Sequence, residues 1–429
     1  MMVKREAYLS QLRELKNIQI IKVVAGVRRC GKSTLLEQFR NELLLEGVSV
    51  SNIQYYNLED PENTHFEHWR DFYLHIKNTL SDKGMNYIFL DEIQMLDHFE
   101  RFLDGLHILK NVDLYVTGSN AYLLSSELAT ILTGRAITIE MYPFSFLEYA
   151  EYQKIEKPVD GDLVHYLQTG GFPQALELLS LSRSAYENYL KGLYSAILEK
   201  DIKPRNTIYN ETAFENLLRF LSDSIGSPVS ANSIANYFVH TKDNIEDKTV
   251  SRYISILNKS YLFYHANRFD LKGKKILKTQ GKEYIVDTGF RHVLLWRENL
   301  SDLGHILENV IYFELLRRGN SVWIGKNATR EIDFVTKDTN GYMHYYQVCL
   351  TMREESTRER ELAPLLNLKN HHPKTVICLD PEEPTYNGIV QRNATKWLIT
   401  PNSSPSSPPE RGYSSILNLP LSYLLLECG

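Results

Sequence analysis

Two hydrophobic periods alternate along the first 120 residues of the chain. Apolar, β-branched runs predict strands at residues 18–25, 52–60, 87–90 and 112–120. Apolar residues at helical spacing predict helices at residues 33–44 and around 66–80. Strands that alternate with helices in this way are typical of a parallel sheet flanked by helices, so we expect an α/β fold.

The first predicted strand runs directly into the sequence GVRRCGKS, residues 26–33, which has the form G-x-x-x-x-G-K-S. In such a loop successive backbone N–H groups point into one concavity that binds phosphate, and the glycines permit the close approach. We expect Lys32 to reach the β- and γ-phosphates and the Ser33 hydroxyl to ligate Mg²⁺. The predicted nucleotide contacts are Gly26, Val27, Arg28, Arg29, Cys30, Gly31, Lys32, Ser33 and Thr34.

Polar side chains follow two further predicted strands. Asp91 and Glu92 end the strand at 87–90, and Asn120 ends the strand at 112–120. Beside a phosphate loop, the first carboxylate is suited to holding Mg²⁺ through water and the second to orienting or deprotonating a hydrolytic water. Asn120 can sense the γ-phosphate or position that water. Each of these groups alone is also an ordinary turn signal, and the phosphate loop favours the catalytic interpretation.

These motifs resemble the AAA-type ATPases with an additional catalytic glutamate, and more closely a prokaryotic ATPase family that carries a C-terminal domain of unknown function. The resemblance covers roughly residues 1 to 390 and rests on AGVRRCGKSTLL, IFLDEIQ, LYVTGSNAYLLSSELATILTGRAITIEMYPFSFLEY and TGGFPQAL. It implies that the nucleotide is ATP, and that an arginine after the third strand motif contacts the γ-phosphate within the subunit or across an interface. The matching residue is Arg135, for which a solvated surface arginine is the alternative.

The pattern becomes helical after the motif MYPFSFLEY and stays so to about residue 205. The charged residues near the end of this stretch, Asp201, Lys203 and Arg205, are candidates to relay nucleotide state to the next domain, with a solvated helix end as the alternative. The predicted order of parts is a P-loop ATPase core at 1–145, a helical lid at 146–205, a winged-helix domain at 206–295, an α/β restriction-endonuclease-like domain at 296–395, and a linker and tail at 396–429.

Three helical patterns followed by two strands predict the winged helix, whose third helix and wing would contact DNA through residues 247–282. Lys248 begins the candidate recognition helix, and the wing holds Lys272, Lys274, Lys275, Lys278 and Lys282. Winged helices also serve as protein–protein spacers. Asp243, Glu246 and Asp247 lie just before the third helix and weaken the DNA interpretation.

A helix–strand–strand order near residues 303–351 resembles the restriction-endonuclease-like core, in which carboxylates and an E-x-K sequence hold metal and activate water. Glu308 matches the helix acid and Asp333 the strand acid, but Gln347 and Cys349 stand where glutamate and lysine are needed. Cysteine cannot replace an ammonium group in stabilising charge on phosphate, so we expect a degenerate module that does not cleave. A metal-dependent nuclease is the alternative.

Composition narrows the setting of these motifs. The net charge of −5 gives no global attraction to nucleic acid, so DNA contact requires a local basic patch. The four cysteines show no paired spacing, and no apolar run approaches membrane length, which together favour a cytoplasmic protein. We expect an ATPase whose hydrolysis drives a conformational change, with an ATP-gated nuclease or a slow nucleotide-dependent scaffold as alternatives. A protein partner or a homo-oligomer is compatible with each.

Overall fold

The computed structural model describes residues 3–63, 68–119, 134–239, 245–273, 275–295, 302–327 and 330–400. The described residues up to Ile399 form one compact unit. Asn120 and the predicted tail beyond residue 400 lie outside the described residues.

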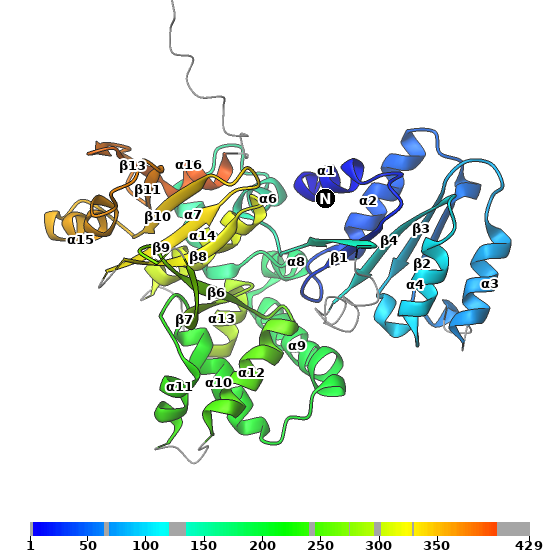
Figure 1. Cartoon of the computed structure of the whole chain (residues 1–429), viewed down its shortest axis with the longest axis horizontal. Helices are drawn as coiled ribbons and strands as arrows, with labels where there is room; N and C mark the ends of the chain where they lie inside the picture. The colour runs from blue at the N-terminus through cyan, green and yellow to red at the C-terminus, as the bar shows by residue number, and fades with distance from the viewer. Residues whose placement is uncertain are drawn as a thin grey trace, which may run out of the picture. The chain divides into compact units, whose positions relative to one another are not determined.

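The N-terminal part is built on a parallel sheet in the strand order β2-β3-β4-β1-β5 (Figure 1). Its strands are β1 (Ile21–Ala25), β2 (Ile53–Asn57), β3 (Asn86–Asp91), β4 (Val112–Gly118) and β5 (Ala136–Glu140). Every residue of β1, β3 and β4 is buried, as expected for strands covered on both faces. This confirms the predicted α/β core.

Among the described residues, the helices that accompany this sheet are α1 (Glu6–Glu14), α2 (Lys32–Leu45), α3 (Trp69–Thr79) and α4 (Phe99–His107). Their apolar stripes explain why they form. Phe39 of α2, for example, packs with its ring centroid 5.1 Å from that of Tyr115 on β4. Because all five strands are parallel, their carboxyl ends lie along one edge, which is where ligands bind in open α/β sheets.

Helices dominate the chain from residue 146 to 259. They are α6 (Phe146–Gln153), α7 (Asp160–Thr169), α8 (Pro173–Leu181), α9 (Arg183–Ala196), a π-helix (Ile197–Ile202), a 3-10 turn (Lys203–Arg205), α10 (Glu211–Asp223), α11 (Ala231–Phe238) and α12 (Asp247–Lys259). The α6 helix starts with a capping box between Ser145 and Glu148, and Pro173 occupies the first turn of α8. Such local signals explain why these boundaries were predictable.

The second sheet has the order β12-β13-β11-β10-β9-β8-β6-β7 and mixes parallel with antiparallel pairs (Figure 1). Its strands are β6 (Phe263–Asp270), β7 (Lys275–Ile285), β8 (Ser321–Asn327), β9 (Arg330–Lys337), β10 (Met343–Val348), β11 (Lys374–Cys378), β12 (Thr385–Tyr386) and β13 (Ile389–Asn393). The accompanying helices are α13 (Thr288–Leu295), α14 (Leu303–Arg317), α15 (Glu355–Leu366) and α16 (Ala394–Ile399).

The two strands that were expected to form the wing, β6 and β7, are instead part of this second sheet. The strands β6 and β7 pair with each other, and β6 also pairs in parallel with β8. The boundary predicted at residues 295 and 296 therefore falls inside one continuous sheet. The helix–strand–strand order near residues 303–351 suggested a separate domain, but strand pairing with β6 is a long-range property that local patterns do not encode.

A buried aspartate joins the TGGFP turn to the second sheet. The Asp287 carboxylate accepts hydrogen bonds from the backbone N–H of Gly171 at 2.6 Å and of Gly289 at 2.9 Å. Gly170, with φ +72°, is the neighbouring residue, and a Cβ atom there would lie 2.0 Å from the carboxylate. Only glycine fits this contact, which explains the glycine pair in the turn.

Burial raises the pKa of Asp287 to about 6, above the ~3.9 expected in an unfolded chain. Between these values the native state keeps a proton that the unfolded state has lost, so stability falls as pH rises through this window. We expect Asp287→Asn, which cannot ionise, to gain about 2 kcal/mol relative to the parent between about pH 4 and pH 7. Urea unfolding of both proteins at the two pH values tests this, and a constant difference between them contradicts it.

Candidate nucleotide site

The phosphate loop joins β1 to α2 and adopts a conformation that requires its glycines. Gly26 has φ +155°, and a Cβ atom there would lie 2.1 Å from the carbonyl oxygen of Met141. Gly31 has φ +107° and precedes the first residue of α2. A side chain at either position is therefore strained or blocked, and the loop forms the concavity expected of a phosphate cradle at a helix N-terminus.

The Lys32 ammonium is held inside this loop. It donates hydrogen bonds to the carbonyl oxygens of Gly26 at 3.0 Å and Val27 at 3.2 Å, and it lies 3.9 Å from Glu92 Oε1. The lysine is nearly fully buried, so its charge acts in a poorly solvated setting. A buried cation over the loop concavity is the arrangement that phosphate binding needs.

Asp91 ends β3 beside the loop and is buried. It accepts hydrogen bonds from the hydroxyls of Thr117 on β4 and Tyr55 on β2, and the Ser33 hydroxyl also interacts with it. Burial raises the pKa of the Asp91 carboxyl, and the Ser33 and Thr117 hydroxyls counteract part of that increase. The end of β3 and the start of α2 thus bring together the Asp91 carboxylate and the Ser33 hydroxyl. Both are oxygen ligands of the kind that Mg²⁺ prefers.

Glu92 has a left-handed backbone conformation, with φ +55°. Its N–H donates to the Thr117 hydroxyl at 2.9 Å, which anchors the backbone to β4. The Gln94 amide donates to the Glu92 carboxylate and, at 3.3 Å, to the Ser119 hydroxyl. A non-glycine residue in this conformation costs energy, so the hydrogen bonds that fix Glu92 are what hold its carboxylate toward the loop.

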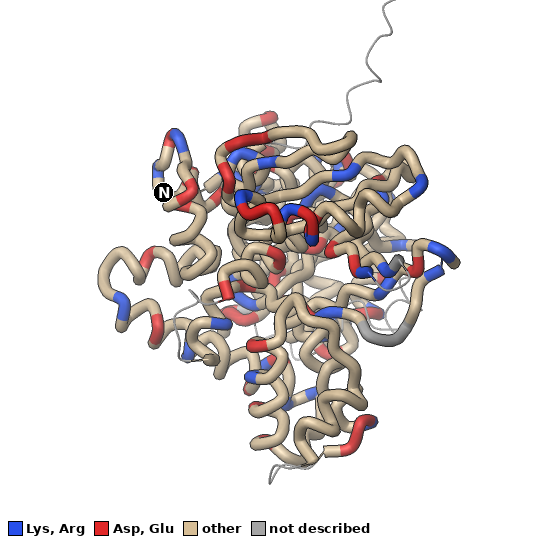
Figure 2. The backbone as a smooth tube through the Cα atoms, turned by 90° about the vertical axis from the view of Figure 1, so that its left-hand side faces the viewer, with Lys and Arg blue, Asp and Glu red and all other residues tan. Residues whose placement is uncertain are grey.

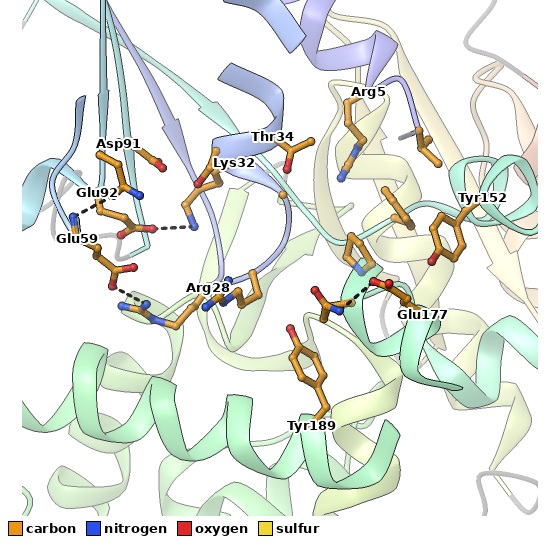
Figure 3. Close-up of a pocket in the computed structure, with 18 residues that line it drawn as sticks. Arg5, Arg28, Lys32, Thr34, Glu59, Asp91, Glu92, Tyr152, Glu177 and Tyr189 are labelled. Carbon is orange, nitrogen blue, oxygen red and sulfur yellow. Dashed lines mark hydrogen bonds and ion pairs between the residues drawn. The ribbon is translucent and has the colours of Figure 1, made fainter. Parts of the chain in front are cut away.

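These residues line one cavity of about 590 Å³. Figure 3 shows Asp91, Glu92 and Lys32 on one side of it and Tyr152, Glu177 and Tyr189 on the other. The lining residues are Val3, Arg5, Arg28, Arg29, Gly31, Lys32, Ser33, Thr34, Asn57, Glu59, Asp91, Glu92, Phe144, Tyr152, Pro173, Gln174, Glu177 and Tyr189. The walls therefore come from the sheet core, the N-terminal segment and the helices α6, α8 and α9.

Most of the predicted nucleotide contacts line this cavity, but three of them and Asn120 do not do so in the described structure. Gly26, Val27 and Cys30 are part of the loop without lining the cavity, and burial raises the pKa of the Cys30 thiol. Asn120 lies outside the described residues. Any nucleotide contact of Val27 and Cys30 would be made by their backbone.

Arg135 lies at the opposite end of the sheet from the phosphate loop. Ile21, the first residue of β1, donates its N–H to the Arg135 carbonyl, whereas the loop follows the last residue of β1. Five strand residues separate these ends, which is about 15 Å at the usual rise. The Arg135 side chain is exposed and pairs with Asp104. This placement gives no support to a role within the same subunit, so a role across an interface and an ordinary surface arginine are the two remaining predictions.

Sequence reasoning missed Arg5 and Glu59, which line the cavity, and it named Asp201 only as a candidate relay and not as part of the site. The Arg5 guanidinium is buried, donating to Glu148 at 2.7 Å and to the carbonyl oxygens of Cys30 and Tyr142. Glu59 and Asp201 both pair with Arg28. Asp201 is buried and not part of a solvated helix end. A lone charged residue in a helical pattern carries no local signal of such a long-range pairing.

The residues expected to contact DNA do not form one exposed basic surface. Lys248, Lys272 and Lys275 are exposed, but Lys282 is buried, and Arg252 donates to the Thr207 carbonyl at 2.7 Å. The Lys274 residue and the Lys278 side chain lie outside the described part. Acidic and basic positions are interspersed along the backbone (Figure 2).

Lys282 occupies the carboxylate cluster of the predicted endonuclease-like core. Its ammonium lies 2.9 Å from Glu308, 2.8 Å from Glu331 and 3.8 Å from Asp333. The Tyr284 hydroxyl also donates to Glu308 at 2.7 Å. Coulombic attraction from these acids outweighs burial and raises the pKa of Lys282. The position of the E-x-K lysine is held by Cys349, as the sequence shows, but Lys282 of β7 pairs directly with Glu308 and Asp333, the acids that would hold a metal.

The chain belongs to a family of proteins that combine an AAA domain with a domain of unknown function. The AAA domain model matches residues 19–150, and the model of the domain of unknown function (DUF8612) matches residues 160–301. An uncharacterized protein of Haemophilus influenzae is 34% identical over 93% of this chain and 99% of its own length. An uncharacterized protein of Methanocaldococcus jannaschii is 29% identical over 80% of this chain and 77% of its own length.

Solved structures show weaker similarity. A Walker-type ATPase of Pyrococcus abyssi is 16% identical, covering 68% of this chain and 96% of that one, with a TM-score of 0.44. AMPPCP-bound DnaA from Aquifex aeolicus is 16% identical, covering 60% and 88%, with a TM-score of 0.33. These similarities are too low to transfer any function.

The two family models confirm the AAA part of the predicted resemblance, and neither extends over residues 302–400. Among the described residues, no helix is long and apolar enough to cross a membrane.

Proposed function

We propose that this protein binds Mg-ATP in the cavity beside the phosphate loop and hydrolyses it to ADP and phosphate. The observation that carries the proposal is the convergence of Lys32, Ser33, Asp91 and Glu92 on one cavity. Such a set pairs a phosphate cradle with a carboxylate that can act on water. The AAA domain match supports ATP as the nucleotide.

Each residue has a separate task in this proposal. The loop N–H groups and the Lys32 ammonium bind the phosphates, and Lys32 exchanges its hydrogen bonds with the loop carbonyls for phosphate oxygens. Glu92 takes a proton from the attacking water, and its distance from Lys32 suits a carboxylate near the γ-phosphate position. Gln94 orients the Glu92 carboxylate through its amide. Protein groups thus position the reactants and stabilise charge, as phosphoryl transfer requires.

The Ser33 hydroxyl and the Asp91 carboxylate fit the requirements of Mg²⁺. Mg²⁺ usually takes only one or two protein ligands, and the remaining positions are filled by water and phosphate oxygens. Asp91 fits as one such group because its buried charge lacks a cationic partner within ion-pair distance in the described structure. When bound, Mg²⁺ would neutralise charge on the β- and γ-phosphates.

The cavity also supports coupling of hydrolysis to a conformational change. Its lining residues include Pro173, Gln174 and Glu177 of α8 and Tyr189 of α9, opposite the sheet core. A nucleotide that contacts both walls has a different affinity for each relative arrangement of the walls. This difference in affinity shifts the equilibrium between the arrangements. The proposal includes contact with DNA through the exposed residues Lys248, Lys272 and Lys275. The proposal does not include nuclease activity, because the Lys282 ammonium already pairs with Glu308 and Asp333.

The test is phosphate release by purified protein with Mg-ATP or Mg-GTP, alone and with double-stranded DNA, single-stranded DNA or RNA. Lys32→Ala, purified in the same way, is the blank. Because Lys32→Ala removes a cation that binds the transferred phosphoryl group, we expect the rate of phosphate release to fall about 100-fold or more. Equal rates in parent and blank contradict the proposal. A rate that rises with one nucleic acid only in the parent supports coupling to that nucleic acid.

A further inference from the structure

A single buried carboxylate connects the phosphate loop with the strand that follows the catalytic acids. Asp201 accepts two hydrogen bonds from the Arg28 guanidinium, at 3.0 Å from Nε and 3.2 Å from Nη2. It also accepts a hydrogen bond from the Ser119 hydroxyl, just after β4, at 3.0 Å. Asp201 is 3% exposed and Arg28 is 7% exposed. A bidentate pair of this kind fixes the plane and the direction of the guanidinium.

Arg28 is thereby aimed into the nucleotide cavity. It is one of the lining residues, and its third contact, from Nη1 to Glu59 at 2.9 Å, comes from the end of β2 (Figure 3). Glu92, the proposed acceptor of the water proton, lines the same cavity as Arg28. Two carboxylates pair with Arg28, the buried Asp201 and the exposed Glu59, so a phosphate group entering the cavity meets a cation held in place.

The Asp201 side chain comes from a π-helix, Ile197–Ile202, that follows α9 without a break. Single π-helical turns inside a helix cost stability and often occur at functional sites. The wider turn here places a buried acid where it can bond Arg28, 173 positions away in sequence. Through Ser119 and Gln94, hydrogen bonds continue from Asp201 to Glu92.

We infer that Asp201 is a positioning residue of the ATPase site, which holds Arg28 toward the γ-phosphate of ATP and links that contact to the π-helix. The inference rests on the proposed function. It assigns to Arg28 the γ-phosphate contact within the subunit, which Arg135 cannot make from the far end of the sheet. ADP lacks the γ-phosphate, so the Asp201–Arg28 pair distinguishes ATP from ADP.

The experiment compares Asp201→Asn with the parent in its affinities for ADP and for a non-hydrolysable ATP analogue. Loss of a charge-assisted contact to the γ-phosphate predicts that the affinity for the analogue falls about 10- to 100-fold, with ADP affinity unchanged within about twofold. Glu199→Gln is the matched control, because Glu199 lies on the same π-helix, is 62% exposed and pairs with Lys203. We expect the control to bind both nucleotides as the parent does.

Arg28→Lys covers the case in which Asp201→Asn does not fold, since it keeps the charge and removes the fork. It should also lose the preference for the ATP analogue. When Asp201→Asn is added to Arg28→Lys, the affinity for the ATP analogue should fall little further. Equal losses for ADP and the analogue, or independent losses in the double variant, overturn the inference. Because these readouts are binding ratios, they decide it separately from phosphate release, whose absence in the parent would contradict the proposed function alone.

Discussion

Glu92→Gln is expected to bind Mg-ATP as tightly as the parent and to hydrolyse it about 100-fold or more slowly, because general-base catalysis typically contributes 10²–10⁴. Glutamine keeps the size of the side chain and can retain the contact with Gln94, but it cannot take a proton from water. The measurement is kcat from phosphate release together with the dissociation constant from equilibrium binding.

Asp97→Asn is the matched control for this substitution, because Asp97 is an exposed acid five positions further along the chain. We expect the control to retain the parental kcat. Hydrolysis by Glu92→Gln at the parental rate would remove Glu92 from the mechanism. A parallel loss of ATP affinity would instead assign Glu92 to nucleotide binding.

Lys282→Met is expected to destabilise the protein by about 3–5 kcal/mol, the usual effect of removing one partner from a buried ion pair. The substitution keeps most of the side-chain volume but leaves Glu308, Glu331 and Asp333 without their shared cation. Burial and the neighbouring Glu308 raise the pKa of Asp333 well above its ordinary value, and the Lys282 charge counteracts part of that increase. Urea unfolding of parent and variant measures the loss.

Lys275→Met provides the control, because Lys275 lies on the same strand and is exposed. We expect its free energy of unfolding to stay within about 0.5 kcal/mol of the parental value. The deficit of Lys282→Met should shrink as the pH is lowered and the carboxylates become neutral. A small loss of unfolding free energy that does not depend on pH would show that Lys282 does not stabilise Glu308, Glu331 and Asp333.

The parts of the site that were predictable are those encoded within a few residues. The phosphate loop requires glycines at fixed spacing, and Asp91 and Glu92 directly follow an apolar strand, so each could be placed without the fold. Parallel strands then bring their carboxyl ends to one edge, which is why separate motifs converge. The same reasoning identified Arg28 as a loop residue but not the direction of its side chain.

The parts that were not predictable depend on pairing between distant segments. Asp201 reaches Arg28 across 173 positions, and Lys282 reaches Glu308 from a strand that was expected to form a free wing. Arg135 follows the expected motif, but its backbone position at the amino end of β5 takes it away from the loop. In each case the residue type was visible in the sequence, and its partner was set by tertiary structure alone.

The most direct test of the central claim is a single-turnover experiment with protein in excess over γ-labelled Mg-ATP. The parent is predicted to convert bound ATP to ADP and phosphate in one phase, Glu92→Gln to retain bound ATP, and Lys32→Ala to leave ATP largely unbound. Bound ATP that the parent never converts, or conversion that proceeds equally in all three proteins, would contradict the assignment of an ATPase site to this cavity.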